Sequence, residues 1–182
     1  AFVQLGVNQT IRNLPATASG LEAEINSHPI HGLTLQLNAA AMSSNVKNVE
    51  LPYPNTPPFT LVEHDLPQAP SFSGNALARY EFPLGDGLLS VQSDVLYTSK
   101  FCFTLLCAPD EHESSYTVAN ARLGYGAQDG HWEVAAFVNN LNNEKYRVYA
   151  FDSSTFAGVT AGVYGKPRTY GITATYRIGS GP

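Results

Sequence analysis

The chain has 182 residues, of which 43% are hydrophobic and 14% are charged, and its formal net charge is -5. The negative charge argues against a nucleic-acid partner, because phosphate binding needs a basic surface. No segment approaches the roughly 18 consecutive apolar residues that a transmembrane helix needs, so a chain of this kind that crosses a membrane does so as strands. The first residues show no signal-peptide pattern and no initiator Met, which predicts an internal or processed start.

Apolar and polar residues alternate with a period of two along most of the chain, which is typical of strands with one apolar and one polar face. In residues 20–26, apolar side chains occupy the odd positions, and acidic or amide side chains occupy the even ones. Six later runs repeat this pattern. The sequence therefore predicts seven strands, over residues 20–26, 33–41, 71–82, 89–98, 119–125, 132–139 and 169–178. An eighth, incomplete strand is predicted between Phe2 and Ile11, where the alternation is less regular.

The predicted connections between these strands alternate in length. Short ones fall at 29–32, 83–87 and 127–130, and long ones fall at 45–69, 102–114 and 142–166. A transmembrane barrel has short periplasmic turns at one rim and long extracellular loops at the other. The predicted fold is therefore all-β, made of antiparallel transmembrane β-barrel strands.

The composition of the two faces separates a membrane barrel from a soluble β-sandwich or lipocalin-type barrel, whose strands also alternate. The apolar face is rich in Ala and Gly with aromatic residues near the segment ends, which suits contact with outer-membrane lipid. The polar face carries amides, hydroxyls and single charges, with little Lys. We expect it to line the barrel lumen, and the predicted wall residues are Gln36, Asn75, Arg79, Gln92, Asp94, Asn120, Arg122, Glu133 and Arg177.

The two cysteines, Cys102 and Cys107, are separated by four residues. This spacing is compatible with a small disulfide-closed loop in an oxidising compartment, and two free thiols are the alternative. A zinc site would need further ligands, and only His112 is close.

No arrangement typical of an enzyme or a cofactor site occurs in the sequence. Glu22 and Glu24 share a face, but on a lumen-facing strand we expect them to be solvated or paired with Arg79, Arg122 or Arg177 rather than catalytic. The five His residues lack metal-ligand spacing, so neither a metal nor another cofactor is predicted.

The long connections contain the candidate ligand contacts. Aromatic rings and single charges gather in two of them, and such residues suit either capture of a small molecule or simple packing at the rim. The candidates are Tyr53, Phe59, Tyr146, Arg147, Tyr149, Phe151, Phe156 and Tyr164.

Four segments, in this order, resemble the C-terminal barrel region of TonB-dependent outer-membrane receptors. They are 20–24 with 29–35 (GLEAE and PIHGLTL), 66–70 (LPQAP), 138–146 (VNNLNNEKY) and 167–171 (PRTYG). The resemblance implies that residues 1–178 form about the last eight strands of a roughly 22-stranded plugged barrel. Residues 179–182 would be a tail, which departs from the aromatic residue that usually ends such receptors.

The same resemblance implies a receptor rather than an enzyme, which imports a scarce nutrient across the bacterial outer membrane. Ferric siderophores are the commonest substrate class of the family, and carbohydrate or cobalamin remain alternatives. The implied partners are an N-terminal plug, the remaining barrel strands, the TonB complex and an extracellular small molecule; the plug and the TonB-interacting segment would lie outside this sequence. The alternatives are a small self-contained outer-membrane barrel with a structural or adhesive role, and a soluble ligand-binding β-protein.

Overall fold

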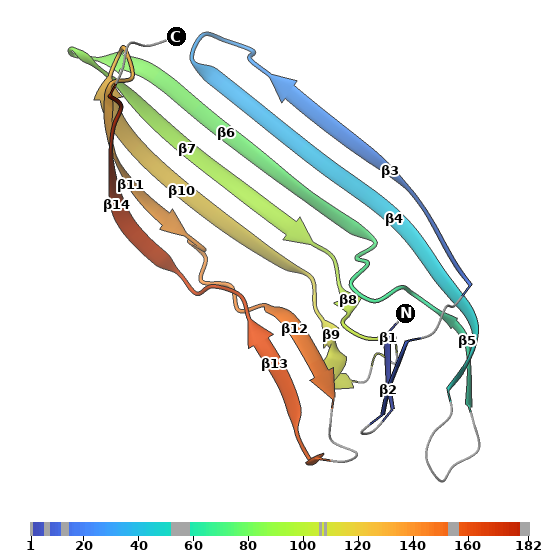
Figure 1. The fold of residues 1–182 in the computed structure, drawn as a ribbon. Helices are drawn as coiled ribbons and strands as arrows, with labels where there is room; N and C mark the ends of the chain where they lie inside the picture. Colours follow the sequence, from blue (N-terminus) through green and yellow to red (C-terminus); the bar gives the residue numbers. More distant parts are fainter. Residues whose placement is uncertain are drawn as a thin grey trace.

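The computed structural model describes residues 2–5, 8–11, 15–51, 59–105, 107, 109–152 and 157–178. Its main feature is one antiparallel sheet, which runs from β14 through β11, β10, β7, β6 and β4 to β3 (Figure 1). The strands are β3 (Ala16–Ser27), β4 (Leu33–Leu51), β6 (Phe72–Leu84), β7 (Gly87–Thr98), β10 (Tyr116–Ala127), β11 (Trp132–Asn139) and β14 (Thr169–Tyr176). Within the described ranges, no helix has the length and apolar character needed to cross a membrane.

All seven strands that the alternation predicts are present, and each pairs with its neighbours along the chain. The short connections also lie where they are expected, together at one end of the sheet, with the long connections at the other end (Figure 1). Each short turn contains a glycine with a positive φ, namely Gly32, Gly85 and Gly130. This left-handed conformation is accessible to glycine without the steric cost that other residues bear, so the turns can be tight.

The turn between β10 and β11 is also held by a side chain. The His131 backbone N–H donates a hydrogen bond of 3.1 Å to the Asp129 carboxylate. This bond stabilises the ionised form, so the pKa of Asp129 lies below its ordinary value.

The prediction of an incomplete eighth strand between Phe2 and Ile11 is wrong. These residues form a separate hairpin of β1 (Phe2–Leu5) and β2 (Asn8–Ile11), which pair antiparallel with each other. The irregular alternation follows from this geometry, because a chain reversal inside the segment interrupts the period of two.

The long connections are more regular than predicted. β4 continues to Leu51 and pairs there with β5 (Phe59–His64). The other two contain the hairpins of β8 (Phe101–Cys102) with β9 (His112–Glu113), and of β12 (Arg147–Asp152) with β13 (Thr160–Tyr164). Beyond the barrel span these hairpins need no lipid-facing side, so their residues lack the alternation by which the main strands are recognised.

One face of the main sheet is almost entirely apolar. Residues directly opposite one another on paired strands share a face, and the registers place Leu35, Ala78, Ser93, Ala121 and Val138 in one such row. Ser93 is a polar member of this row, as is Ser27 opposite Leu35 on β3, and the Ser93 hydroxyl donates to the Asn120 carbonyl at 3.1 Å. Aromatic rings flank this apolar band, with Tyr80, Phe82, Tyr125, Trp132 and Tyr176 toward the short turns, and Phe72, Tyr97 and Tyr170 toward the long loops.

The apolar side chains of this face are not packed into a protein core. Ile172 is 76% exposed and Leu123 is 51% exposed, whereas the few buried apolar residues include Phe103 and Leu105 in the connection between β7 and β10. A continuous exposed apolar surface of this kind needs a nonaqueous partner. The aromatic girdles at both of its margins identify that partner as a bilayer.

An added charge should destabilise the protein much more on the apolar face than on the polar face. Ala76 lies on the apolar face midway between Phe72 and Tyr80, and the next residue, Leu77, faces the other way, opposite Gln36 and Asp94. In the full-length protein we expect Ala76→Arg to lower the free energy of unfolding by about 2–4 kcal/mol, the cost of Arg in the bilayer midplane. The change is measured by urea unfolding in phospholipid vesicles.

Leu77→Arg is the matched control, because it adds the same side chain one residue away beside the Asp94 carboxylate. Its expected cost is under about 1 kcal/mol. Equal destabilisation by the two variants would contradict the assignment of the faces.

Candidate lumen wall and ligand-binding rim

Eight of the nine residues predicted to line the wall lie on one face of the sheet, opposite the apolar band. Two rows contain most of them: Arg79, Gln92 and Arg122 are directly opposite one another, and Asp94 lies opposite Asn120 in the next row. Of the other wall residues, Gln36, Asn75 and Glu133 belong to the same face by register. Arg177 directly follows Tyr176 of the apolar face at the end of β14, and its N–H donates to the His131 carbonyl at 2.8 Å. The common face of the other eight agrees with the prediction, whereas their contact with a lumen remains a prediction.

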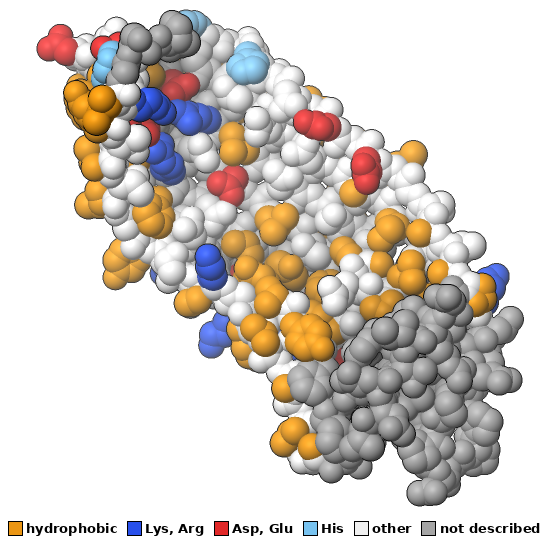
Figure 2. Space-filling model, in the orientation of Figure 1, with side chains coloured by type: hydrophobic (Ala, Val, Ile, Leu, Met, Phe, Trp, Pro, Cys, Tyr) orange, Lys and Arg blue, Asp and Glu red, His pale blue; other side chains and the backbone are white. Residues whose placement is uncertain are grey.

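Charged side chains on this polar face gather toward the short turns (Figure 2). Arg122 donates two hydrogen bonds to the Glu133 carboxylate, at 2.9 and 2.7 Å, and Arg79 forms a 2.7 Å ion pair with Glu81. Arg177 donates to the Gly130 carbonyl at 2.6 Å. The side chains of Arg122 and Glu133 are 28% and 29% exposed, so their two-pronged pair is partly shielded from water.

Arg79 and Arg122 pair with Glu81 and Glu133, not with the glutamates singled out in the sequence. Glu22 and Glu24 lie on the exposed strand β3, and Glu24 accepts a hydrogen bond from Asn26. Of the two alternatives that the sequence left open, solvated carboxylates describe them better.

The pair of Arg122 and Glu133 depends on the absence of a side chain at Gly124. A Cβ atom there would lie 2.6 Å from the Glu133 Oε1 atom and 2.6 Å from the Ser90 hydroxyl. Because the pair crosses this position diagonally, glycine is the residue that leaves room for it.

The character of the polar face changes between the turn end and the loop end. In the middle, Asn38 donates to Asn75 at 3.2 Å and Asn120 donates to Asp94 at 2.6 Å. Nearer the loops, the same face carries Leu96 opposite Val118, and hydrophobic side chains gather over this region in Figure 2. The wall therefore passes from ion pairs through amides to an apolar region.

A buried amide at the end of β11 organises the start of the longest loop. Asn140 is 3% exposed and has a φ of 53°. Its side-chain oxygen accepts from the Glu144 N–H at 2.7 Å, while its nitrogen donates to the carbonyls of Glu144 and Lys166 at 2.9 and 3.1 Å. Its own N–H donates to the Asn120 side chain at 2.8 Å. Asn140 thus joins the two ends of the loop through its side chain and the neighbouring strand through its backbone N–H.

Asn142 fixes the same loop to the neighbouring strand. Its side chain accepts from the Ala119 N–H at 3.1 Å and donates to the Thr117 carbonyl at 2.7 Å. Sequence reasoning used the segment 138–146 only as a family resemblance and missed this role. The signal was the cluster of asparagines directly after a strand, since asparagine tolerates positive φ and can cap backbone groups.

The structure locates only some of the candidate ligand contacts. Tyr53 and Phe156 lie outside the described residues, and of Phe59 and Phe151 only the strand assignment is described. Tyr146 stacks on Tyr116, with ring centroids 4.5 Å apart. Tyr149 and Tyr164, on the hairpin of β12 and β13, are 45% and 66% exposed.

Arg147 has protein partners instead of an open guanidinium. Its Nε donates to the Glu113 carboxylate at 2.7 Å and its Nη1 donates to the Asp110 carbonyl at 2.7 Å, while its Nη2 donates to the His112 carbonyl. The guanidinium also lies over the Phe103 ring, 5.6 Å from its centroid. The sequence predicts Arg147 only as a candidate ligand contact and does not indicate these partners.

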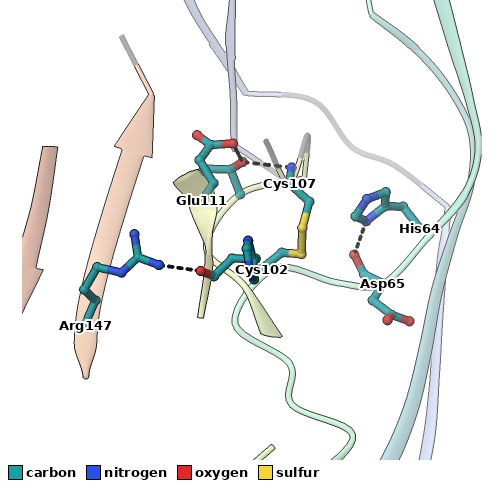
Figure 3. The surroundings of a disulfide bond; sticks show 8 residues. His64, Asp65, Cys102, Cys107, Glu111 and Arg147 are labelled. Atoms are coloured by element: carbon teal, nitrogen blue, oxygen red, sulfur yellow. Dashed lines mark hydrogen bonds between the residues drawn. A yellow bond between two sulfur atoms is a disulfide. The ribbon is translucent and has the colours of Figure 1, made fainter. Parts of the chain in front are cut away.

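The predicted disulfide is present in the structure, between Cys102 and Cys107. It closes a short loop that begins at Cys102 of β8 (Figure 3), and β8 lies at the loop end of the sheet (Figure 1). An oxidised pair at this position agrees with a compartment outside the cytosol.

The single sheet with an apolar band between aromatic girdles, a polar opposite face and alternating short and long connections defines the wall of a transmembrane β-barrel. Residues 2–141 match the family model of the TonB dependent receptor-like β-barrel. The chain therefore belongs to this family of bacterial outer-membrane receptors.

Solved structures share the fold at low sequence identity. The ferric yersiniabactin uptake receptor FyuA from Yersinia pestis is 20% identical with a TM-score of 0.72, and the match covers 87% of this chain and 23% of FyuA. The siderophore receptor PiuA from Acinetobacter baumannii is 15% identical with a TM-score of 0.70, over 95% of this chain and 23% of PiuA.

The ferric-catecholate import receptor Fiu from E. coli K12 is 19% identical with a TM-score of 0.63, over 87% of this chain and 20% of Fiu. The chain thus spans about a quarter or less of the length of these receptors.

The hydrogen bonds of Asn140 lead to a stability prediction for the full-length protein. Asn140→Ala removes the side-chain hydrogen bonds to the Glu144 N–H and to the carbonyls of Glu144 and Lys166, and each lost hydrogen bond costs about 1 kcal/mol. We expect the free energy of unfolding in vesicles to fall by about 3 kcal/mol.

Asn143→Ala is the matched control. Asn143 is exposed and has a similar φ of 55°, so both variants share the cost of placing alanine in the left-handed region. That cost alone is about 1–2 kcal/mol. A loss for Asn140→Ala no larger than the control loss would show that the buried amide contacts contribute nothing.

Proposed function

We propose that this chain forms part of the barrel of a receptor that imports a ferric siderophore, with energy delivered through TonB. Family membership is the observation that carries the proposal. It is supported by the likeness in fold to a ferric yersiniabactin uptake receptor, a siderophore receptor and a ferric-catecholate import receptor. In this proposal residues 1–178 are the C-terminal portion of the barrel, residues 179–182 are a tail, and the protein is a transporter rather than an enzyme.

The layered polar face suits a wall around a plug. The amides of Asn38, Asn75 and Asn120 offer donors and acceptors at mid-height, and the ion pairs of Arg79 and Arg122 lie nearer the short turns, which face the periplasm in such barrels. In the proposed protein, these groups hydrogen-bond the plug, while the long loops bind the ligand outside the cell. The plug, the remaining strands, TonB and the siderophore are the proposed partners.

The exposed tyrosines support ligand capture at the loop end. Tyr149 and Tyr164 present rings to solvent on a hairpin that extends beyond the sheet. An aromatic ring supplies a large contact area at low cost in conformational entropy, which suits an aromatic or heterocyclic iron chelate.

The alternative of a small self-contained barrel is less well supported. In the described part of the chain, β3 and β14 each pair on one side only, so the seven-stranded path is not closed. A soluble ligand-binding protein is opposed by the exposed apolar band. Neither alternative is favoured by a specific observation.

Uptake of radiolabelled iron tests the proposal in cells. A strain that lacks the full-length gene is supplied with a ferric catecholate, a ferric hydroxamate or a ferric phenolate, and we expect uptake of one complex to be lost. The loss should be restored by the wild-type gene and should also occur in a TonB-deficient strain. Tyr164→Ala should lower the affinity for that complex by about 10-fold, the typical effect of one aromatic contact.

Cobalamin and a maltodextrin serve as controls for the substrate class. Unchanged uptake of all three ferric complexes together with lost uptake of either control would reject the siderophore and keep the receptor. Normal uptake of every compound would reject the transport function itself.

A further inference from the structure

The loop end of the sheet is held together by a compact cluster centred on the disulfide. The connection between β7 and β10, residues 99–115, contains the disulfide and is called the disulfide loop. It folds on itself, because the Phe103 N–H donates to the Glu111 carbonyl at 2.8 Å and Thr104 donates to the Glu111 carboxylate at 2.5 Å. Phe103 and Leu105 are 4% and 1% exposed, so two apolar side chains of this connection are buried.

Two other connections join this disulfide loop from different sides. The Gln68 N–H, in the segment that precedes β6, donates to the Cys102 carbonyl at 2.7 Å. Arg147, at the start of β12, reaches it from the connection between β11 and β14. In Figure 3 the disulfide lies between Arg147 and the segment of His64 and Asp65.

The contacts of Arg147 are those of a structural anchor. Three of its nitrogens donate to separate acceptors on Glu113, Asp110 and His112, and its charge lies over the Phe103 ring. The side chains of Arg147 and Glu113 are 23% and 10% exposed. A guanidinium can satisfy acceptors in this forked arrangement, whereas a lysine ammonium is a point charge that cannot span them all.

The anchor bears on the exposed tyrosines because they lie on the same hairpin. Tyr164 pairs directly with Arg147 across β12 and β13, and Tyr149 lies two residues beyond Arg147. Thr160, at the start of β13, adds a 3.5 Å hydrogen bond to Asp110. The position of the hairpin is therefore set by the disulfide loop, not by the barrel strands alone.

We propose that Arg147 is a positioning residue, which together with the Cys102–Cys107 disulfide holds the hairpin of β12 and β13 in the arrangement that binds the ligand. The role of the hairpin in binding rests on the proposed function, whereas the coupling of the two loops does not. Arg147 and the disulfide act on one unit, so the loss of either releases both loops.

Hydrogen exchange of the full-length protein in detergent tests the coupling without any ligand. We expect Arg147→Ala to speed amide exchange about 10-fold, the effect of losing roughly 1.4 kcal/mol of local stability. The increase should appear in peptides from both 99–115 and 145–164, and be absent from peptides of β6 and β7. The double variant Cys102→Ser with Cys107→Ser should give the same pattern, and adding Arg147→Ala to it should change little.

The control variants separate charge from geometry. Arg147→Lys keeps the charge but not the fork, so we expect exchange between that of the wild type and that of Arg147→Ala. Arg168→Ala removes an exposed arginine near β14 and should leave exchange in 99–115 unchanged. Faster exchange in only one of the two loops, or fully additive effects of the arginine and cysteine changes, would overturn the coupling.

The affinities for the ferric catecholate, hydroxamate and phenolate complexes test the positioning role. For the complex that the wild type binds, Arg147→Ala should weaken binding about 10-fold, and Arg147→Lys should restore part of the loss. Unchanged affinity alongside faster exchange would overturn positioning. If the wild type binds none of the three, the siderophore proposal fails. The exchange experiment alone then decides whether Arg147 and the disulfide couple the two loops.

Discussion

The structure depends on one constraint: every backbone polar group that crosses the hydrocarbon must be paired within the protein, while the two faces of each strand meet different surroundings. Antiparallel pairing from β3 to β14 gives the backbone N–H and C=O groups of the interior strands their hydrogen-bond partners. The alternation of side chains suits the two different surroundings, since Ala76 and Leu77, neighbours in the chain, belong to opposite faces. The turns, the aromatic girdles and the position of the loops all follow from strands that span one bilayer.

At the loop end, this constraint no longer applies and ordinary protein packing replaces it. Buried apolar residues such as Phe103 and Leu105 occur there, together with the nearly buried ion pair of Glu113 and Arg147. Asn140 forms the boundary between the two regimes, because it ends β11 and ties both ends of the following loop to the wall. A rigid span thus carries loops whose arrangement is set by side chains, which suits a receptor that presents a binding surface.

The sequence alone predicts the strands well because the period-two rule acts on every residue of a span. It fails between Phe2 and Ile11, where a hidden reversal breaks the rule, and in the long loops, whose hairpins lack a lipid face. The wall residues could be assigned to one face, but not the partners of Arg122 or Arg147. The partner of Arg122 depends on strand register and on the missing side chain at Gly124. The partner of Arg147 is Glu113, which lies 34 positions away in the chain.

We conclude that the apolar face of the sheet meets lipid and the polar face does not. Spin labels placed singly at residues 117–125 of β10, in the full-length protein in lipid vesicles, test it by their collision rates with oxygen and with a water-soluble nickel complex. We expect oxygen accessibility to oscillate with a period of two, with maxima at Ala119, Ala121 and Leu123 and minima at Asn120 and Arg122. Uniform accessibility, or maxima at Asn120 and Arg122, would contradict the claim.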